Sequence, residues 1–128
     1  MALQSYRELR VWQEAMDLVT EVYKLVQSLP KSEIFSLGDQ LRRASVSIPC
    51  NIAEGFGRQH TREFVQFLAI AKGSLSELET QVLIAQRLEY TRDETAAALL
   101  ARTESVGRMI SALRTSLEKR ASPEKRGN

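Results

Sequence analysis

The side chains best suited to chemistry in this sequence are basic and lie between positions 42 and 62. They are Arg42, Arg43, Arg58, His60 and Arg62. The only acidic residue in that span is Glu54, so the span has an excess of positive charge. Guanidinium groups bind phosphate through charge-assisted hydrogen bonds, and a helix expected to begin near position 62 adds unpaired amide N–H groups. The group predicts a phosphate-binding spot, although an ordinary charged loop explains it equally well.

A second polar pattern recurs at helical spacing in the same region. Gln40, Arg43, Ser47, Asn51 and Glu54 follow one another at steps of three and four residues, which places them on one side of a helix. One interpretation is a polar groove or lumen that receives a ligand. The other is structural, either a solvated face or a hydrogen-bonded network that fixes the register between helices. We favour the structural interpretation.

Catalytic and metal-binding arrangements are not indicated by the sequence. Cys50 follows Pro49 and has no neighbouring base to activate its thiol. The single histidine excludes a multi-histidine metal site, and the single cysteine excludes an internal disulfide. No glycine-rich phosphate loop is present. We therefore predict no catalytic residue, no metal and no cofactor.

Length and composition are those of one folded domain. The chain has 128 residues, of which 43% are hydrophobic and 27% charged. It contains no run of 18 apolar residues and no signal peptide, so we expect a cytoplasmic protein without a membrane partner. The formal net charge is +2, yet residues 101–128 alone carry seven Lys or Arg and three Glu. We expect one domain over residues 1–120 and a flexible basic tail over residues 121–128 that reaches anionic polymers.

Four helices are expected, over residues 6–29, 37–55, 62–87 and 92–120. A Ser or Thr followed three residues later by an acidic residue satisfies the first amide N–H groups of a helix. Such pairs are Ser5 with Glu8, Ser36 with Asp39, and Thr91 with Glu94. Pro30 and the glycines at 55 and 57 mark two of the expected stops.

Apolar residues recur at steps of three and four along the expected helices. In the last helix they include Leu99, Val106, Ile110, Leu113 and Leu117. Such a stripe needs facing helices, and short connections favour antiparallel neighbours. The sequence therefore predicts an all-α fold, an antiparallel up-and-down four-helix bundle. Gly73 costs about 1 kcal/mol in the middle of a helix, which predicts a compensating close approach of another helix.

The first helix has a wider apolar surface than a bundle helix requires. Its apolar residues cover about 180° of the circumference, against a typical stripe of somewhat more than about 100°. The excess predicts a cover from a neighbouring subunit of a homo-oligomer. The candidate interface residues are Val11, Leu18, Val22 and Leu25. The alternative is that the helix is deeply buried within its own chain.

Several blocks of the sequence resemble a known bacterial family. They are Leu9–Ala15, Pro30–Ala44, Ser47–Arg58 and Glu63–Glu77, of which Asn51–Gly55 is the most specific. They resemble the four-helix bundle proteins encoded by intervening sequences of 23S ribosomal RNA genes. The resemblance implies a ring-like homopentamer without established catalytic activity. A related group, the accessory variability determinants of diversity-generating retroelements, is similar in fold and binds nucleic acid and a reverse transcriptase through a basic pentamer.

The resemblance carries over Arg42, Arg43 and Arg58 as shared basic positions, whereas His60 and Arg62 are candidates from their location alone. The leading hypothesis is a non-enzymatic oligomeric bundle that binds RNA or DNA with little sequence specificity. The alternative is a protein-interaction scaffold, a homopentameric adaptor that does not bind nucleic acid. A pocket for a small ligand inside the bundle or ring is a third, weaker hypothesis.

Overall fold

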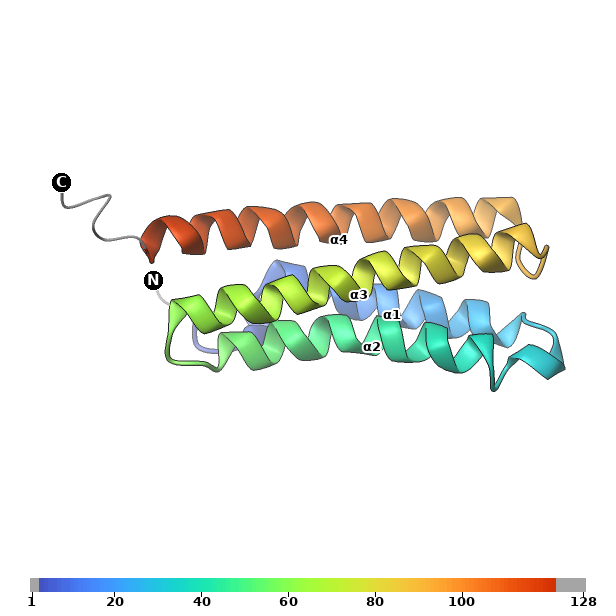
Figure 1. Ribbon diagram of the computed structural model, residues 1–128, viewed down its shortest axis with the longest axis horizontal. Helices are drawn as coiled ribbons and strands as arrows, with labels where there is room; N and C mark the ends of the chain where they lie inside the picture. The colour runs from blue at the N-terminus through green and yellow to red at the C-terminus, as the bar shows by residue number, and fades with distance from the viewer. Residues whose placement is uncertain (1–2, 122–128) are drawn as a thin grey trace.

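Residues 3–121 are the part of the chain that the computed structural model describes, and they form four long helices (Figure 1). The helices are α1 (Arg10–Gln27), α2 (Leu37–Phe56), α3 (Thr61–Arg87) and α4 (Asp93–Arg120), with single 3-10 turns η1 (Tyr6–Glu8) and η2 (Lys31–Glu33). Successive helices run in opposite directions and pack side by side. Within these residues there is no strand, and no helix is long and apolar enough to cross a membrane. The predicted all-α four-helix bundle is confirmed.

The connections between the helices lie at the two ends of the bundle. The α2–α3 connection and the C-terminal end of α4 lie at one end, together with the N-terminal segment (Figure 1). The α1–α2 and α3–α4 connections lie at the opposite end. The predicted basic tail over residues 121–128 follows α4, and its residues 122–128 lie outside the described part of the chain.

Helix boundaries match the expected ones within one residue for α2, α3 and α4. The expected first helix is wrong at both ends. Leu9 is extended, with φ −72° and ψ 125°, and separates η1 from α1, which already ends at Gln27. Ser5 caps only η1, because its Oγ accepts a hydrogen bond from the backbone N–H of Arg7 at 3.1 Å. Thr91 is not the cap of α4, which begins after Arg92.

The core is apolar and runs the length of the bundle between all four helices. Val11, Leu18, Val22 and Leu25 belong to this core and are between 0% and 5% exposed. The prediction that these four residues lie at a subunit interface is therefore wrong, because α2 and α4 of the same chain pack against α1. Packing inside its own chain removes most of the apolar surface of α1 from water, whereas Met16 and Tyr23 of the same surface stay 42% and 43% exposed.

Two glycines in the helices have different surroundings. A Cβ atom at Gly55 would lie 2.8 Å from Cδ1 of Phe64 and 2.8 Å from Cβ of Phe67, so α2 and α3 approach closely there. Gly55 lies inside α2, which continues to Phe56, and it is not the expected helix stop. A Cβ atom at Gly73 would meet no atom of the described chain within 4 Å. The predicted close approach at Gly73 is therefore wrong within one chain.

The polar row on α2 lies along its boundary with α3. Ser47 Oγ lies 2.8 Å from Ser74 Oγ of α3. The Asn51 side-chain amide donates to the carbonyl and hydroxyl oxygens of Ser47, at 2.8 and 3.0 Å. Hydrogen bonds of this kind tie the two helices in one register. The central part of the row therefore has the structural role that we favoured.

Candidate nucleic-acid interface

The basic residues predicted to form one site are divided between the two ends of the bundle. Arg42 and Arg43 lie in the first third of α2, whereas Arg58 directly follows its C-terminal residues. At a rise of about 1.5 Å per residue, the helix separates these positions by about 24 Å. Arg58, His60 and Arg62 remain close together in the α2–α3 connection and the first turn of α3.

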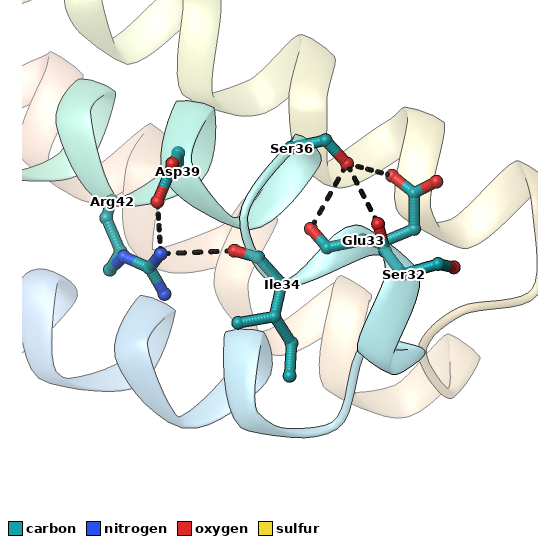
Figure 2. A network of polar contacts seen from close by, with 6 residues as sticks. All are labelled: Ser32, Glu33, Ile34, Ser36, Asp39 and Arg42. Carbon is teal, nitrogen blue, oxygen red and sulfur yellow. Dashed lines mark hydrogen bonds and ion pairs between the residues drawn. The ribbon is translucent and has the colours of Figure 1, made fainter.

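Arg42 holds the α1–α2 connection in place (Figure 2). Its guanidinium donates to the carbonyl oxygen of Ile34 at 3.1 Å and forms an ion pair with Asp39. Only 22% of the Arg42 side chain is exposed. In the same connection, Ser36 is the N-cap residue of α2, but its Oγ donates to the carboxylate of Glu33 at 2.8 Å and makes no capping hydrogen bond. The contacts give Arg42 a structural role and leave little of its guanidinium for phosphate.

Arg43 is exposed and lies beside Arg42, at the end of the bundle opposite Arg58, His60 and Arg62. It lines a shallow depression together with Tyr23 of α1 and Val46 of α2. No ion pair of Arg43 is formed within residues 3–121. Asp39, Arg42 and Ser47 line the same depression, so Arg43 stands among polar and charged side chains, as is typical of a solvated surface.

The opposite end carries a net positive charge, and we call residues 5–12, 54–65 and 113–121 the basic end. It contains seven Lys or Arg and four Glu, a net charge of +3. The basic side chains are Arg7, Arg10, Arg58, Arg62, Arg114, Lys119 and Arg120, and the acidic ones are Glu8, Glu54, Glu63 and Glu118. The remaining described residues contain nine basic and eleven acidic side chains. The positive charge of the described chain is thus concentrated at one end.

Antiparallel packing brings the end of α4 beside the start of α3. Lys72 of α3 donates a hydrogen bond to Ser111 of α4. The Thr103 hydroxyl of α4 donates to the Glu79 carboxylate of α3 at 3.1 Å. The same register continued along the two helices puts Arg62 level with Arg120. Both residues are exposed, and neither forms an ion pair within the described residues.

The α2–α3 connection presents three cationic or titratable side chains at its surface. Arg58 pairs with Glu54 at 2.8 Å and lies over the ring of Phe67, with 4.8 Å from its Cζ to the ring centroid. His60 is the N-cap residue of α3, and its carbonyl accepts the first hydrogen bonds of the helix while its side chain caps nothing. The imidazole and the Arg62 guanidinium are therefore exposed beside a helix N-terminus, where anions are favoured.

Sequence reasoning missed the aromatic residues that build this end. Phe56 and Phe64 pack edge to face, with ring centroids 6.1 Å apart and planes at 89°. Phe67 lies under Arg58. Gly55 was the available signal. A glycine inside a helix indicates that another group packs closely against the backbone there, and Phe64 and Phe67 of α3 are the residues that do so.

The groove between α1 and α4 has charged side chains of both signs. A groove of about 810 Å³ runs between α1 and α4 and contacts the α3–α4 connection. Its ionisable side chains are Lys24, Arg92, Arg102, Glu21, Glu89 and Glu94. Positively and negatively charged side chains are equal in number and mostly exposed, which is typical of a solvated surface. Within residues 3–121 no three His, Cys, Asp or Glu side chains are placed to hold a metal ion.

The fold and this site define a small up-and-down helical bundle protein with a cationic surface at one end. Residues 7–112 match the family model of the 23S rRNA-intervening sequence protein, and the chain belongs to this family. The further relation to the accessory variability determinants stays a prediction.

A solved structure shares the fold. It is the crystal structure of a protein with unknown function from the S23 ribosomal protein family of Bacteroides thetaiotaomicron VPI-5482. The two chains superpose with a TM-score of 0.76 at 21% sequence identity, over 81% of this chain and 97% of the other. No curated protein matches the sequence.

Proposed function

We propose that this protein is a non-enzymatic binder of RNA or DNA whose basic end contacts phosphates with little sequence specificity. The observation that carries the proposal is the concentration of charge. The basic end has a net charge of +3, although the rest of the described chain has more acidic than basic residues. A patch of one sign attracts a polyanion and releases the counterions condensed on it.

The phosphate contacts come from side chains that no internal partner occupies. Arg62 and Arg120 are exposed at the same level of neighbouring helices and form no ion pair within the described residues. His60 adds a further donor beside them. These contacts go to phosphates, so they position the polymer without specifying its sequence.

The test compares two double variants that remove the same charge from opposite ends. Binding of labelled RNA and duplex DNA is measured by fluorescence anisotropy between about 50 and 200 mM salt. Arg62→Ala with Arg120→Ala is expected to weaken binding at least tenfold and to reduce the salt slope by about two. Arg43→Ala with Arg87→Ala, at the opposite end, is expected to change both quantities little. Equal effects of the two double variants, or no binding by the wild type at low salt, contradict the proposal.

The protein assembles, in the same proposal, into a ring-like homopentamer. The resemblance supplies the number five. Apolar side chains on α3 and directly after it are exposed and could be buried against a second subunit. They are Ile70, Leu83, Ile84 and Leu88, which are 43–52% exposed. A ring repeats the basic end five times and so raises the avidity for a long polyanion.

Light scattering after gel filtration tests the assembly. The expected mass is that of five chains, and Ile70→Glu with Ile84→Glu is expected to reduce it to one chain, because a charge is costly in an apolar interface. Val46→Glu, at the 36% exposed apolar position on α2, is the control and is expected to leave the mass unchanged. A wild-type monomer at working concentration refutes the assembly.

A protein-interaction scaffold without nucleic-acid binding is the second candidate. Phe35 favours it, because this side chain is 81% exposed in the α1–α2 connection, far from the basic end. An exposed aromatic ring of this kind is a common anchor at protein interfaces. Capture of partners from lysate with and without nuclease separates the candidates, since a scaffold retains its partner after nuclease treatment. Loss of capture in Phe35→Ser then identifies the surface.

A further inference from the structure

Arg58 is held between an acidic side chain and an aromatic ring. Its guanidinium pairs with Glu54 at 2.8 Å and lies over the Phe67 ring at 4.8 Å from the centroid. The Arg58 side chain is nevertheless 43% exposed. The Phe67 ring thus covers part of the guanidinium, and the exposed 43% of the side chain leaves room for a further contact. A guanidinium on a ring is fixed in orientation and offers a flat face for a further stacked group.

The most specific block of the sequence builds this arrangement. Gly55 has no side chain, and a Cβ atom there would collide with Phe64 and Phe67. The glycine therefore lets α3 approach α2 closely enough to place the Phe67 ring under Arg58. Glu54, which lies one helical turn before Arg58 in the chain, pairs with the guanidinium. The residues of the motif thus position Arg58, and the phosphate contacts of the proposed function do not require that positioning.

Further aromatic and cationic groups surround Arg58. Phe56 and Phe64 meet edge to face at 6.1 Å, and both are partly exposed. His60 and Arg62 are exposed in the next residues of the chain. Flat faces for bases next to cations for phosphates are the combination used by proteins that hold unpaired nucleotides.

We propose that the basic end binds single-stranded nucleic acid, with one unpaired base stacked on the open face of the Arg58 guanidinium. The inference rests on the proposed function and names its substrate class. In a duplex each base face is covered by its neighbours, so the Arg58 face has no partner there. In a single strand a base turns outward and stacks, while His60 and Arg62 contact the adjacent phosphates.

The test separates stacking from charge. Arg58→Lys keeps the positive charge and the partner Glu54 but removes the planar group. Arg108→Lys is the matched control, because Arg108 also pairs with a Glu four residues earlier, Glu104 at 3.7 Å, and lies over no aromatic ring within the described residues. Fluorescence anisotropy is measured with oligo(dT), oligo(U) and a mixed-sequence duplex, each about 15 nucleotides or base pairs long.

The wild type is expected to bind both single strands more tightly than the duplex. Arg58→Lys is expected to weaken single-strand binding about tenfold, with duplex affinity and the salt slope unchanged because the charge remains. Arg108→Lys is expected to change neither, and thermal unfolding of both variants is expected to match that of the wild type. Oligo(dT) and oligo(U) are expected to bind alike, because both bases present a flat face.

Two results overturn the inference in different ways. If the wild type binds duplex as tightly as single strands, or Arg58→Lys binds single strands like the wild type, stacking on Arg58 is refuted while the proposed function stands. If no nucleic acid binds at low salt, the inference and the proposed function both fail.

Discussion

Replacing Gly55 and Gly73 by alanine is expected to change stability in opposite directions. The two glycines lie inside helices α2 and α3, so alanine improves the intrinsic helix propensity at both by about 1 kcal/mol. Their surroundings differ. A Cβ atom at Gly55 would lie 2.8 Å from Cβ of Phe67 and from the ring of Phe64, whereas one at Gly73 would meet no described atom within 4 Å.

The magnitudes follow from these contacts. At Gly73 only the propensity changes, so Gly73→Ala is expected to stabilise the fold by about 1 kcal/mol. At Gly55 the new methyl group meets the Cβ atom of Phe67, which moves only if α3 moves. Overpacking of this kind costs about 1–3 kcal/mol, which exceeds or offsets the gain in propensity. We therefore expect a net loss of about 1 kcal/mol for Gly55→Ala.

Urea unfolding followed by far-ultraviolet circular dichroism measures both variants. The midpoint is expected to rise for Gly73→Ala and to fall for Gly55→Ala, with the slope unchanged, because the surface exposed on unfolding is the same. All samples are compared at one protein concentration, since assembly contributes stability that depends on concentration. The reasoning is refuted if Gly55→Ala is as stable as Gly73→Ala, because α2 and α3 would then accommodate the added methyl group without a loss in the free energy of unfolding.

Two further substitutions test local features. Glu89 has φ 62° just after α3, and the backbone N–H of Tyr90 donates to the carbonyl of Ala85 at 2.8 Å in the turn that ends the helix. Because glycine adopts this left-handed conformation without a steric cost, Glu89→Gly is expected to stabilise the fold by about 1 kcal/mol, and an unchanged or lower melting temperature contradicts this. Arg42→Ala is expected to lower the free energy of unfolding, measured in urea, by about 1–2 kcal/mol because its hydrogen bonds are lost. Arg43→Ala is expected to change it by less than about 0.5 kcal/mol. Equal losses in the two variants would show that the contacts of Arg42 do not stabilise the fold.

The elements of the fold could be predicted because their signals are local. Apolar spacing along the last helix, from Leu99 to Leu117, needs only the helical repeat to identify a buried face. The limits of α2, α3 and α4 were predicted to within one residue, with Gly57 directly after α2 and acidic residues in the first turn of each of the three helices. The first helix was predicted too long, because Leu9 adopts an extended conformation that no residue type in the segment requires.

The depth at which a helix is buried is not a local property. The apolar width of α1 fitted both a subunit interface and burial in its own chain, and the packing of α2 and α4 buries most of it, whereas Met16 and Tyr23 stay exposed. A sequence pattern records how much surface is apolar. It does not record which neighbour covers that surface.

The sequence by itself determined a helical bundle, its four segments and an excess of basic side chains around the α2–α3 connection. Only the tertiary structure decided which of these side chains lie at the same end of the bundle. The length of α2 moves Arg42 and Arg43 to the far end of the bundle, where Arg42 anchors a connection. Antiparallel packing brings Arg120 level with Arg62 although 57 residues of chain lie between them. Proximity in a bundle depends on helix length and direction, which combine residues distant in the chain and separate residues that are near in it.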